Sequence, residues 1–157
     1  MNDYIQLLVF RLDEQRYALP LELVKRVVRA AEITPLPKAP PIVLGVIDVE
    51  GRVLPVLNIR QRFRLPEREI SPDNQFLIAR TARLTVVLMI DEAQGVIERL
   101  PTEIIGAAHI VPGLEQIQGV TKFNDGLVLI HDLEKFLSLD EAHALDKAMS
   151  QEVMHGT

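Results

Sequence analysis

Four histidines are the side chains of this sequence best suited to bind a metal ion or to transfer a proton at neutral pH. None lies three or four residues from another, which is the spacing that a compact zinc site uses. The chain also has no cysteine, so it offers no thiolate ligand, no thiol nucleophile and no disulfide. We therefore predict no metal site and no cofactor. The four residues are His109, His131, His143 and His155.

Two acidic pairs, Asp13-Glu14 and Asp91-Glu92, could supply the carboxylates of acid–base catalysis. Neighbouring residues in a strand point to opposite faces, however, and both pairs fall where we expect a hairpin to turn. We therefore expect solvated turn residues. The three serines lie outside any Gly-x-Ser-x-Gly elbow, and the chain has no glycine-rich phosphate loop. These patterns predict a protein that is not an enzyme.

The basic stretch RQRFRLPER, from Arg60 to Arg68, is the best candidate for an electrostatic surface. Its simpler interpretation is a solvated helix and loop whose charge Glu67 and Glu69 balance. The formal net charge of −5 argues against general phosphate binding, and aromatic residues, at 4%, leave few rings for base stacking. We expect no nucleic-acid partner, but a nucleic-acid-binding double β-barrel remains the alternative class.

Short β-rich runs dominate the chain and predict an all-β fold of ten strands, because Gly, Pro, Asn and Asp interrupt them at short intervals. A helical turn is expected at Pro20–Val24, and Asp140–Met154 has the spacing of a terminal helix. The expected strands are Ile5–Leu12, Arg16–Leu19, Arg26–Ala31, Val43–Val49, Arg52–Leu57, Gln75–Arg80, Leu84–Ile90, Ala93–Glu98, Ile117–Phe123 and Leu127–His131.

The chain also looks duplicated. The stretch GVIDVEGRVLPVLNI from Gly45 matches GVTKFNDGLVLIHDL from Gly119. Two residues are counterparts in this repeat when they are as far apart in the chain as these two glycines, and we call this separation the repeat offset. Phe10–Leu19 similarly matches Leu88–Ile97, which aligns the two acidic pairs. The same order in both halves predicts two related five-strand lobes. Each lobe should close with a short helix, and the two helices are expected at Ile59–Arg64 and Leu133–Ser138.

The hairpin from Leu44 to Phe63 is apolar on both faces of its strands. Glu50-Gly51 reads as its turn, since glycine supplies the positive φ that a type II or bulged turn requires. One face can line the core of a lobe. The other face needs a cover, which is either the second lobe or another protein.

Residues from about Tyr4 to Leu139 resemble the chemotaxis coupling-protein (CheW-like) family. The resemblance rests on LVFRLDEQRYALPLELVKRVV, TPLPKAPPIVLGVIDVEGRVLPVLNIRQRF and VVLMIDEAQGVIERLP. It implies two interleaved five-stranded SH3-like β-barrels that share a hydrophobic interior, with short helices closing each lobe and a C-terminal helix. We expect one domain over 4–141, with lobes at about 4–72 and 73–139, followed by the helix and tail over 142–157.

The activity that the resemblance implies is scaffolding. Such proteins couple methyl-accepting chemoreceptors to the regulatory domain of a CheA-type histidine kinase, whose fold is the same. By position, Val24 and Gly45 match family sites of receptor-tip binding, with Val96 at the equivalent place in the second lobe. Val24, Arg26 and Val27 are the candidate kinase contacts. A cytoplasmic protein is expected, with no signal peptide and a membrane association only through receptors.

One residue of the hairpin tip departs from the family. The family tip is typically Asn-Leu-Arg-Gly, whereas this chain has Asp48-Val49-Glu50-Gly51, so the charge at the arginine position is reversed. Gly51 matches the family's hairpin glycine. Because a reversed charge changes partner choice more than fold, we expect Glu50 to contact the receptor and to point to a specialised chemosensory system.

Overall fold

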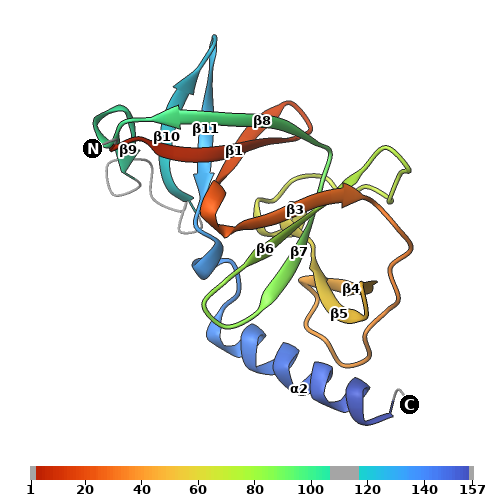
Figure 1. Ribbon diagram of the computed structural model, residues 1–157. Helices are drawn as coiled ribbons and strands as arrows, with labels where there is room; N and C mark the ends of the chain where they lie inside the picture. The colour runs from red at the N-terminus through yellow and green to blue at the C-terminus, as the bar shows by residue number, and fades with distance from the viewer. Residues whose placement is uncertain (1–2, 107–116, 156–157) are drawn as a thin grey trace.

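The computed structural model describes residues 3–106 and 117–155, with side chains up to residue 150, and these residues form two β-sheets and five helical segments (Figure 1). The helical segments are η1 (Leu21–Leu23), α1 (Ile59–Arg62), η2 (Pro101–Glu103), η4 (Leu133–Lys135) and α2 (Leu139–His155). The strands are β1 (Ile5–Leu12), β2 (Gln15–Pro20), β3 (Val24–Arg29), β4 (Val43–Val49), β5 (Arg52–Leu57), β6 (Gln75–Arg80), β7 (Thr85–Ile90), β8 (Glu92–Arg99), β9 (Ile105–Gly106), β10 (Ile117–Phe123) and β11 (Gly126–His131).

The two sheets interleave the halves of the chain. The six-stranded sheet has the order β8-β1-β2-β11-β10-β9, and the five-stranded sheet has the order β3-β6-β7-β5-β4. The hairpin β1–β2 thus lies with strands of the second half, and β6–β7 lies with strands of the first half. This confirms the interleaved all-β fold. Neither sheet coincides with residues 4–72 or 73–139, because each half contributes its first hairpin to the other's sheet.

The sequence repeat is visible in the strand register. The pairing of β4 with β5 shifts between Val43 and Gly45, and that of β10 with β11 shifts between Ile117 and Gly119. Both glycines are needed for close packing. A Cβ at Gly45 would lie 2.3 Å from the Thr34 carbonyl oxygen, and one at Gly119 would lie 2.8 Å from the Ile105 carbonyl oxygen.

The second sequence match, of Phe10–Leu19 with Leu88–Ile97, was wrong as a structural equivalence. Asp13 lies in the turn of the β1–β2 hairpin, as expected. Asp91 lies instead where the chain crosses from β7 in one sheet to β8 in the other. The counterpart of the β1–β2 hairpin is β6–β7, since these two pairs occupy the same places in the two sheets.

Hydrophobic clusters fill each barrel and the space between the two sheets. The largest lies between the sheets and combines Phe10 and Leu19 of the six-stranded sheet with Leu77 and Leu88 of the five-stranded sheet. Two others fill the interior of each barrel, one around Phe76 and the other around side chains of β1, β2 and β11. Burying each such Leu or Phe contributes about 1.5–3 kcal/mol, so the shared cluster makes the two barrels one folding unit.

Two of the expected helices differ from the prediction. The segment expected over Ile59–Arg64 is α1 and ends at Arg62, and that expected over Leu133–Ser138 is a single 3₁₀ turn, η4. Both begin as expected. The side chain of Asn58 accepts a hydrogen bond from the Gln61 amide, and that of Asp132 accepts one from the Glu134 amide. β9, of only two residues, was not predicted.

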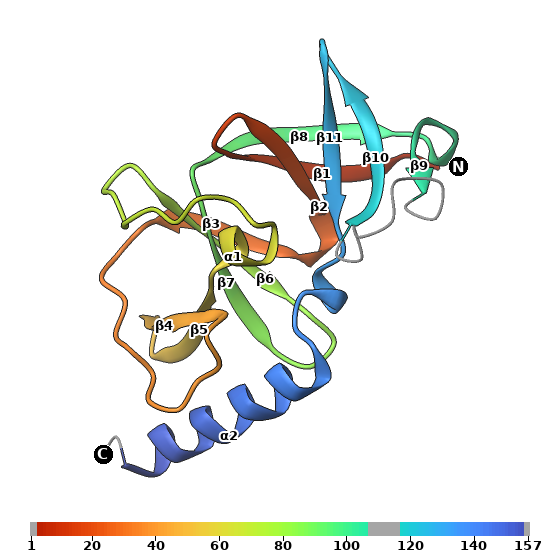
Figure 2. The same cartoon turned by 180° about the vertical axis from the view of Figure 1, so that it is seen from behind.

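Helix α2 packs against the five-stranded sheet (Figures 1 and 2). Its Leu145 and Ala148 are buried against Val46 of β4 and against Leu36. At its start, the Glu141 amide donates to the Ser138 hydroxyl, and the Ser138 amide donates to the Glu141 carboxylate, which forms a capping box. Of the helices in the described residues, none has the length and apolarity of a membrane span.

Candidate partner-binding site

Arg26 of β3 and Glu50 at the tip of the β4–β5 hairpin form an ion pair. The sequence indicates Arg26 as a kinase contact and Glu50 as a receptor contact. Arg26 Nη1 lies 3.1 Å from Glu50 Oε1, with 44% and 78% of the two side chains exposed. Because both charges remain largely hydrated, the pair contributes little to stability, on the order of 0–1 kcal/mol. The pair does show that the hairpin tip lies beside β3.

The hairpin tip is tighter than expected. Glu50 and Gly51 both have positive φ, 53° and 84°, and Val49 pairs with Arg52. Two positive φ values in a two-residue loop are the pattern of a type I′ turn rather than of the type II or bulged turn predicted. The Gly51 amide donates to the Asp48 carboxylate at 2.9 Å. The turn therefore projects the Glu50 side chain from a fixed backbone.

A groove of about 890 Å³ lies between β3 and the β4–β5 hairpin, with the Arg26–Glu50 pair at its edge. β3 is the outermost strand of its sheet, and no ladder partner occupies its outer edge among the described residues. An exposed strand edge beside an apolar groove is a common docking surface for a protein partner. The apolar lining comes from Val28, Ala31, Val46, Ile47, Val49, Val53, Phe76 and Met149.

The other named residues of the first lobe lie outside this groove. Val24 and Val27 are half-buried and pack against the cluster between the sheets. Gly45 is buried under Thr34, whose amide and carbonyl form a bridge with Val46. A residue without a side chain and without an exposed surface can influence binding only through the backbone that it positions.

Val96 lies in the other sheet, on the edge strand β8, and 47% of it is exposed. It pairs with Leu8 of β1, while Val27 pairs with Leu77 of β6. Leu8 and Leu77 hold equivalent ladder positions, so Val96 is the counterpart of Val27. By the register of the two sheets, Val96 therefore corresponds to Val27, one of the candidate kinase contacts.

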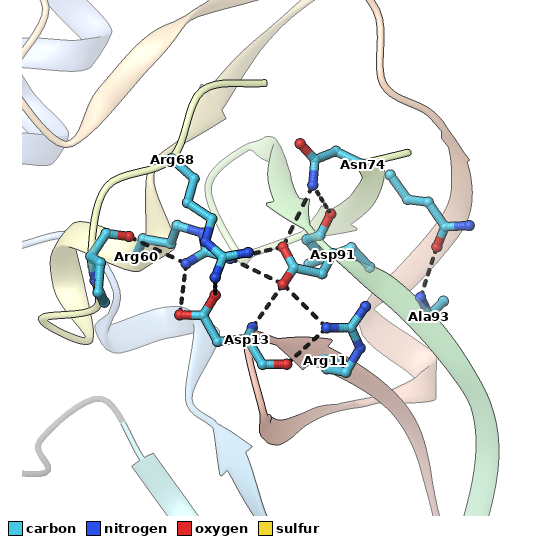
Figure 3. A network of polar contacts seen from close by, with 10 residues as sticks. Arg11, Asp13, Arg60, Arg68, Asn74, Asp91 and Ala93 are labelled. Carbon is cyan, nitrogen blue, oxygen red and sulfur yellow. Dashed lines mark hydrogen bonds and ion pairs between the residues drawn. The ribbon is translucent and has the colours of Figure 1, made fainter. Parts of the chain in front are cut away.

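A buried charge network that sequence analysis missed joins the two sheets at α1 (Figure 3). Arg60, only 3% exposed in its side chain, binds Asp13 at 3.0 Å and Asp91 at 2.8 Å. The Asp13 amide donates to Asp91 at 2.7 Å, and Arg68 lies 2.9 Å from Asp13. The expectation of two solvated acidic turns was therefore wrong for both aspartates, and Arg60 is not part of a solvated basic face.

The pKa shifts of Asp13 and Arg60 both favour the charged forms of these two side chains. The hydrogen bond from Arg60 lowers the pKa of Asp13 below its ordinary value, although partial burial opposes the shift. Burial alone would lower the pKa of Arg60, but its hydrogen bonds to Asp13 and Asp91 outweigh burial and raise it. Asp13 and Arg60 are therefore both charged at neutral pH, and the network is an ion cluster rather than an acid–base pair.

His131 is buried in an aromatic cluster. Its ring lies 5.1 Å from the rings of Phe63 and Phe136, both edge-on, and neither ring nitrogen has a hydrogen-bond partner among the described residues. Burial lowers the pKa of His131 to about 3. Its counterpart at the repeat offset is Leu57, which is also buried, so His131 occupies a core position of the repeat.

In the described part of the chain, no three His, Asp or Glu side chains gather in a way that could hold a metal ion. His109 lies outside the described residues, and so does the side chain of His155. The acidic groups that do cluster, Asp13 and Asp91, are neutralised by arginine. Among the described residues, the arrangement offers exposed surfaces for protein contacts.

Comparison with known proteins points to one group of proteins. A family model described as the CheW-like domain matches residues 6–141. The chemotaxis protein CheW of Bacillus subtilis is 30% identical over 149 residues, which cover 93% of this chain and 90% of that protein. Protein FrzA of Myxococcus xanthus is 33% identical over 92 residues, which cover 59% of this chain and 57% of that protein.

A solved structure agrees with these sequence matches. The scaffolding protein TtCheW of Thermoanaerobacter tengcongensis superposes with a TM-score of 0.79 at 25% identity. The match covers 87% of this chain and 94% of that one. The two interleaved barrels are therefore shared with a protein whose described role is scaffolding.

Proposed function

The chain belongs to the CheW-like domain family and is a non-catalytic chemotaxis adaptor, and from that premise we propose that it couples chemoreceptors to a CheA-type histidine kinase. The observation that carries the proposal is the family match over residues 6–141, in a fold that exposes an edge strand and a groove on its first barrel. A cytoplasmic location, with membrane contact only through receptors, is part of the proposal.

We further propose that the groove beside β3 takes part in kinase and receptor contacts. Arg26 and Glu50 are exposed at its edge and are available to a partner. Val24 and Val27, which are half-buried, support β3 from the other side, and Gly45 supports the hairpin. Val96 would add a contact on the second barrel, where it is exposed.

The reversed charge at Glu50 supports a role in a specialised chemosensory system. Because Arg26 pairs with Glu50 within the chain, the tip presents a paired carboxylate instead of the arginine that is typical of the family. A partner adapted to an arginine at this position would lose its attraction to this tip. We propose that the native receptor and kinase differ from those of an ordinary flagellar array at the residues facing Glu50.

The alternative of a nucleic-acid-binding barrel loses its main support. Three of the four arginines in the stretch from Arg60 to Arg68 are paired within the protein: Arg60 with Asp13 and Asp91, Arg68 with Asp13, and Arg62 with Glu141. Arg64 is exposed. Phosphate binding requires free cations on one face. No observation favours this function over the adaptor.

A binding titration tests the proposal. The CheA regulatory domain and a chemoreceptor tip, both encoded in the same genome, are titrated separately against the chain by calorimetry. We expect both to bind, with a weaker interaction at high salt because exposed charges lie at the groove. Absence of binding by every such kinase domain and receptor tip would refute the coupling role.

A further inference from the structure

Arg60 is held from both sheets at once (Figure 3). It belongs to α1, which follows β5 of the five-stranded sheet, whereas Asp13 lies in the β1–β2 turn of the six-stranded sheet. Asp91 lies at the crossover from β7 to β8. We propose that Arg60 is a positioning residue that fixes the orientation of one barrel relative to the other.

The geometry of the guanidinium supports this role. Its Nη1 donates to Asp13 at 3.0 Å, and its Nη2 donates to both oxygens of Asp91 at 2.8 and 3.0 Å. We call these hydrogen bonds of the two guanidinium nitrogens the Arg60 fork. They are directional, whereas apolar packing between the sheets is not. The hydrophobic cluster therefore holds the barrels together, and the Arg60 fork sets the angle at which they meet.

The repeat supplies a natural comparison. Glu134 of η4 is the counterpart of Arg60 at the repeat offset, and its carboxylate accepts one hydrogen bond from the Ala82 amide at 2.8 Å. Ala82 lies in the turn between β6 and β7, the counterpart of the turn that holds Asp13. The chain thus has the same contact twice, once as a buried ionic fork and once as an exposed single bond. The barrels are fixed at the Arg60 contact and held only weakly at the Glu134 contact.

The consequence for binding rests on the proposed function. An adaptor that engages partners through both barrels binds them simultaneously only if the two surfaces keep one relative geometry. Loosening the Arg60 fork should therefore reduce three-component assembly more than it reduces the binding of either partner alone.

Spin-label distances test whether Arg60 fixes the orientation of the two barrels, a role that we call the clamp. Because the chain has no cysteine, Val53→Cys on β5 and Leu127→Cys on β11 place one label on each barrel, at exposed positions that correspond to each other in the repeat. We expect one narrow distance distribution for the labelled parent and for its Glu134→Gln variant. Arg60→Lys keeps the charge but cannot form the fork, and its distribution should broaden or shift.

The outcomes separate the clamp from the proposed function. A folded Arg60→Lys protein whose distribution matches that of the parent would overturn the clamp. Should that variant fail to fold, Asp13→Asn replaces it, because asparagine tolerates the positive φ of 54° at this turn. It should also broaden the distribution, and an unchanged distribution would again overturn the clamp. Failure of the unlabelled parent to bind kinase or receptor would count against the function and leave the distance result valid.

Discussion

Glu50 carries the charge that distinguishes this hairpin tip, and Arg26 already matches it within the chain. Replacing Glu50 by Arg sets two arginines side by side, but the site is exposed, so the free energy of unfolding should fall by at most about 1 kcal/mol. Binding of the native partner should weaken by roughly 1–3 kcal/mol, because an attraction becomes a repulsion. Urea titrations and binding isotherms measure the two effects.

The matched controls for this change are Glu50→Gln and the double variant Arg26→Glu with Glu50→Arg. The first variant removes the charge of Glu50 and keeps the shape of its side chain. The double variant restores an ion pair in which the acidic and basic positions are exchanged. Stability should return to the parental value in the double variant, but affinity should not. Unchanged affinity in Glu50→Arg would show that the reversed charge has no role in partner choice.

His131 should make the protein sensitive to acid. Because burial lowers its pKa to about 3 from 6.5, the unfolded chain takes up a proton near pH 6.5 that the folded chain does not. The free energy of unfolding should therefore fall as the pH falls below that value, by about 1.4 kcal/mol per pH unit. The lowered pKa of Asp13 acts in the same direction, but only at pH values near and below its ordinary 3.8.

Replacing His131 by Leu, the residue of its repeat partner Leu57, should remove this sensitivity. At neutral pH the change removes two buried nitrogens without partners and two ring contacts, so the net effect there should be small. Denaturant midpoints measured from about pH 7 to about pH 5 should fall steeply for the parent and stay nearly level for the variant. Parallel curves for the two proteins would contradict this account.

At the scale of elements, the β4–β5 hairpin depends on glycine in two different ways. Gly45→Ala forces a Cβ against the Thr34 carbonyl oxygen and should cost about 2 kcal/mol or more. Gly51→Ala meets no neighbouring atom and suffers only from its positive φ, which costs about 1 kcal/mol. Amide exchange at Thr34 and Val46 should accelerate in the first variant and stay slow in the second. Protection of both amides in Gly45→Ala would show that the segment is not displaced.

The elements themselves were largely predictable, because strand and turn chemistry is local. β1, β4, β5, β6 and β10 lie where the sequence predicts them. β9 could not be found, since two residues carry no alternation pattern. Asn58 and Asp132 are residue types that favour helix N-caps, and both cap the helices that follow them, yet the lengths of these helices depend on tertiary packing.

At the scale of the whole molecule, the sequence repeat predicted two related lobes, but it could not show which hairpin joins which sheet. That assignment depends on contacts distant in the chain, and the match around Asp13 and Asp91 misled because it aligned residues of different roles. The same two residues nevertheless meet at Arg60. A buried arginine within a basic stretch gives no local signal. The network of Arg60 with Asp13 and Asp91 therefore could not be inferred from the sequence.

The central claim is that one molecule joins a receptor to a kinase. The most direct test is co-sedimentation of the CheA regulatory domain with membranes that carry the native chemoreceptor, with and without the chain. The account predicts that the kinase domain sediments only when the chain is present, and that Glu50→Arg reduces its sedimentation while Glu134→Gln does not. A kinase domain that remains in the supernatant with the chain bound to receptor, or sediments equally without it, would contradict the claim.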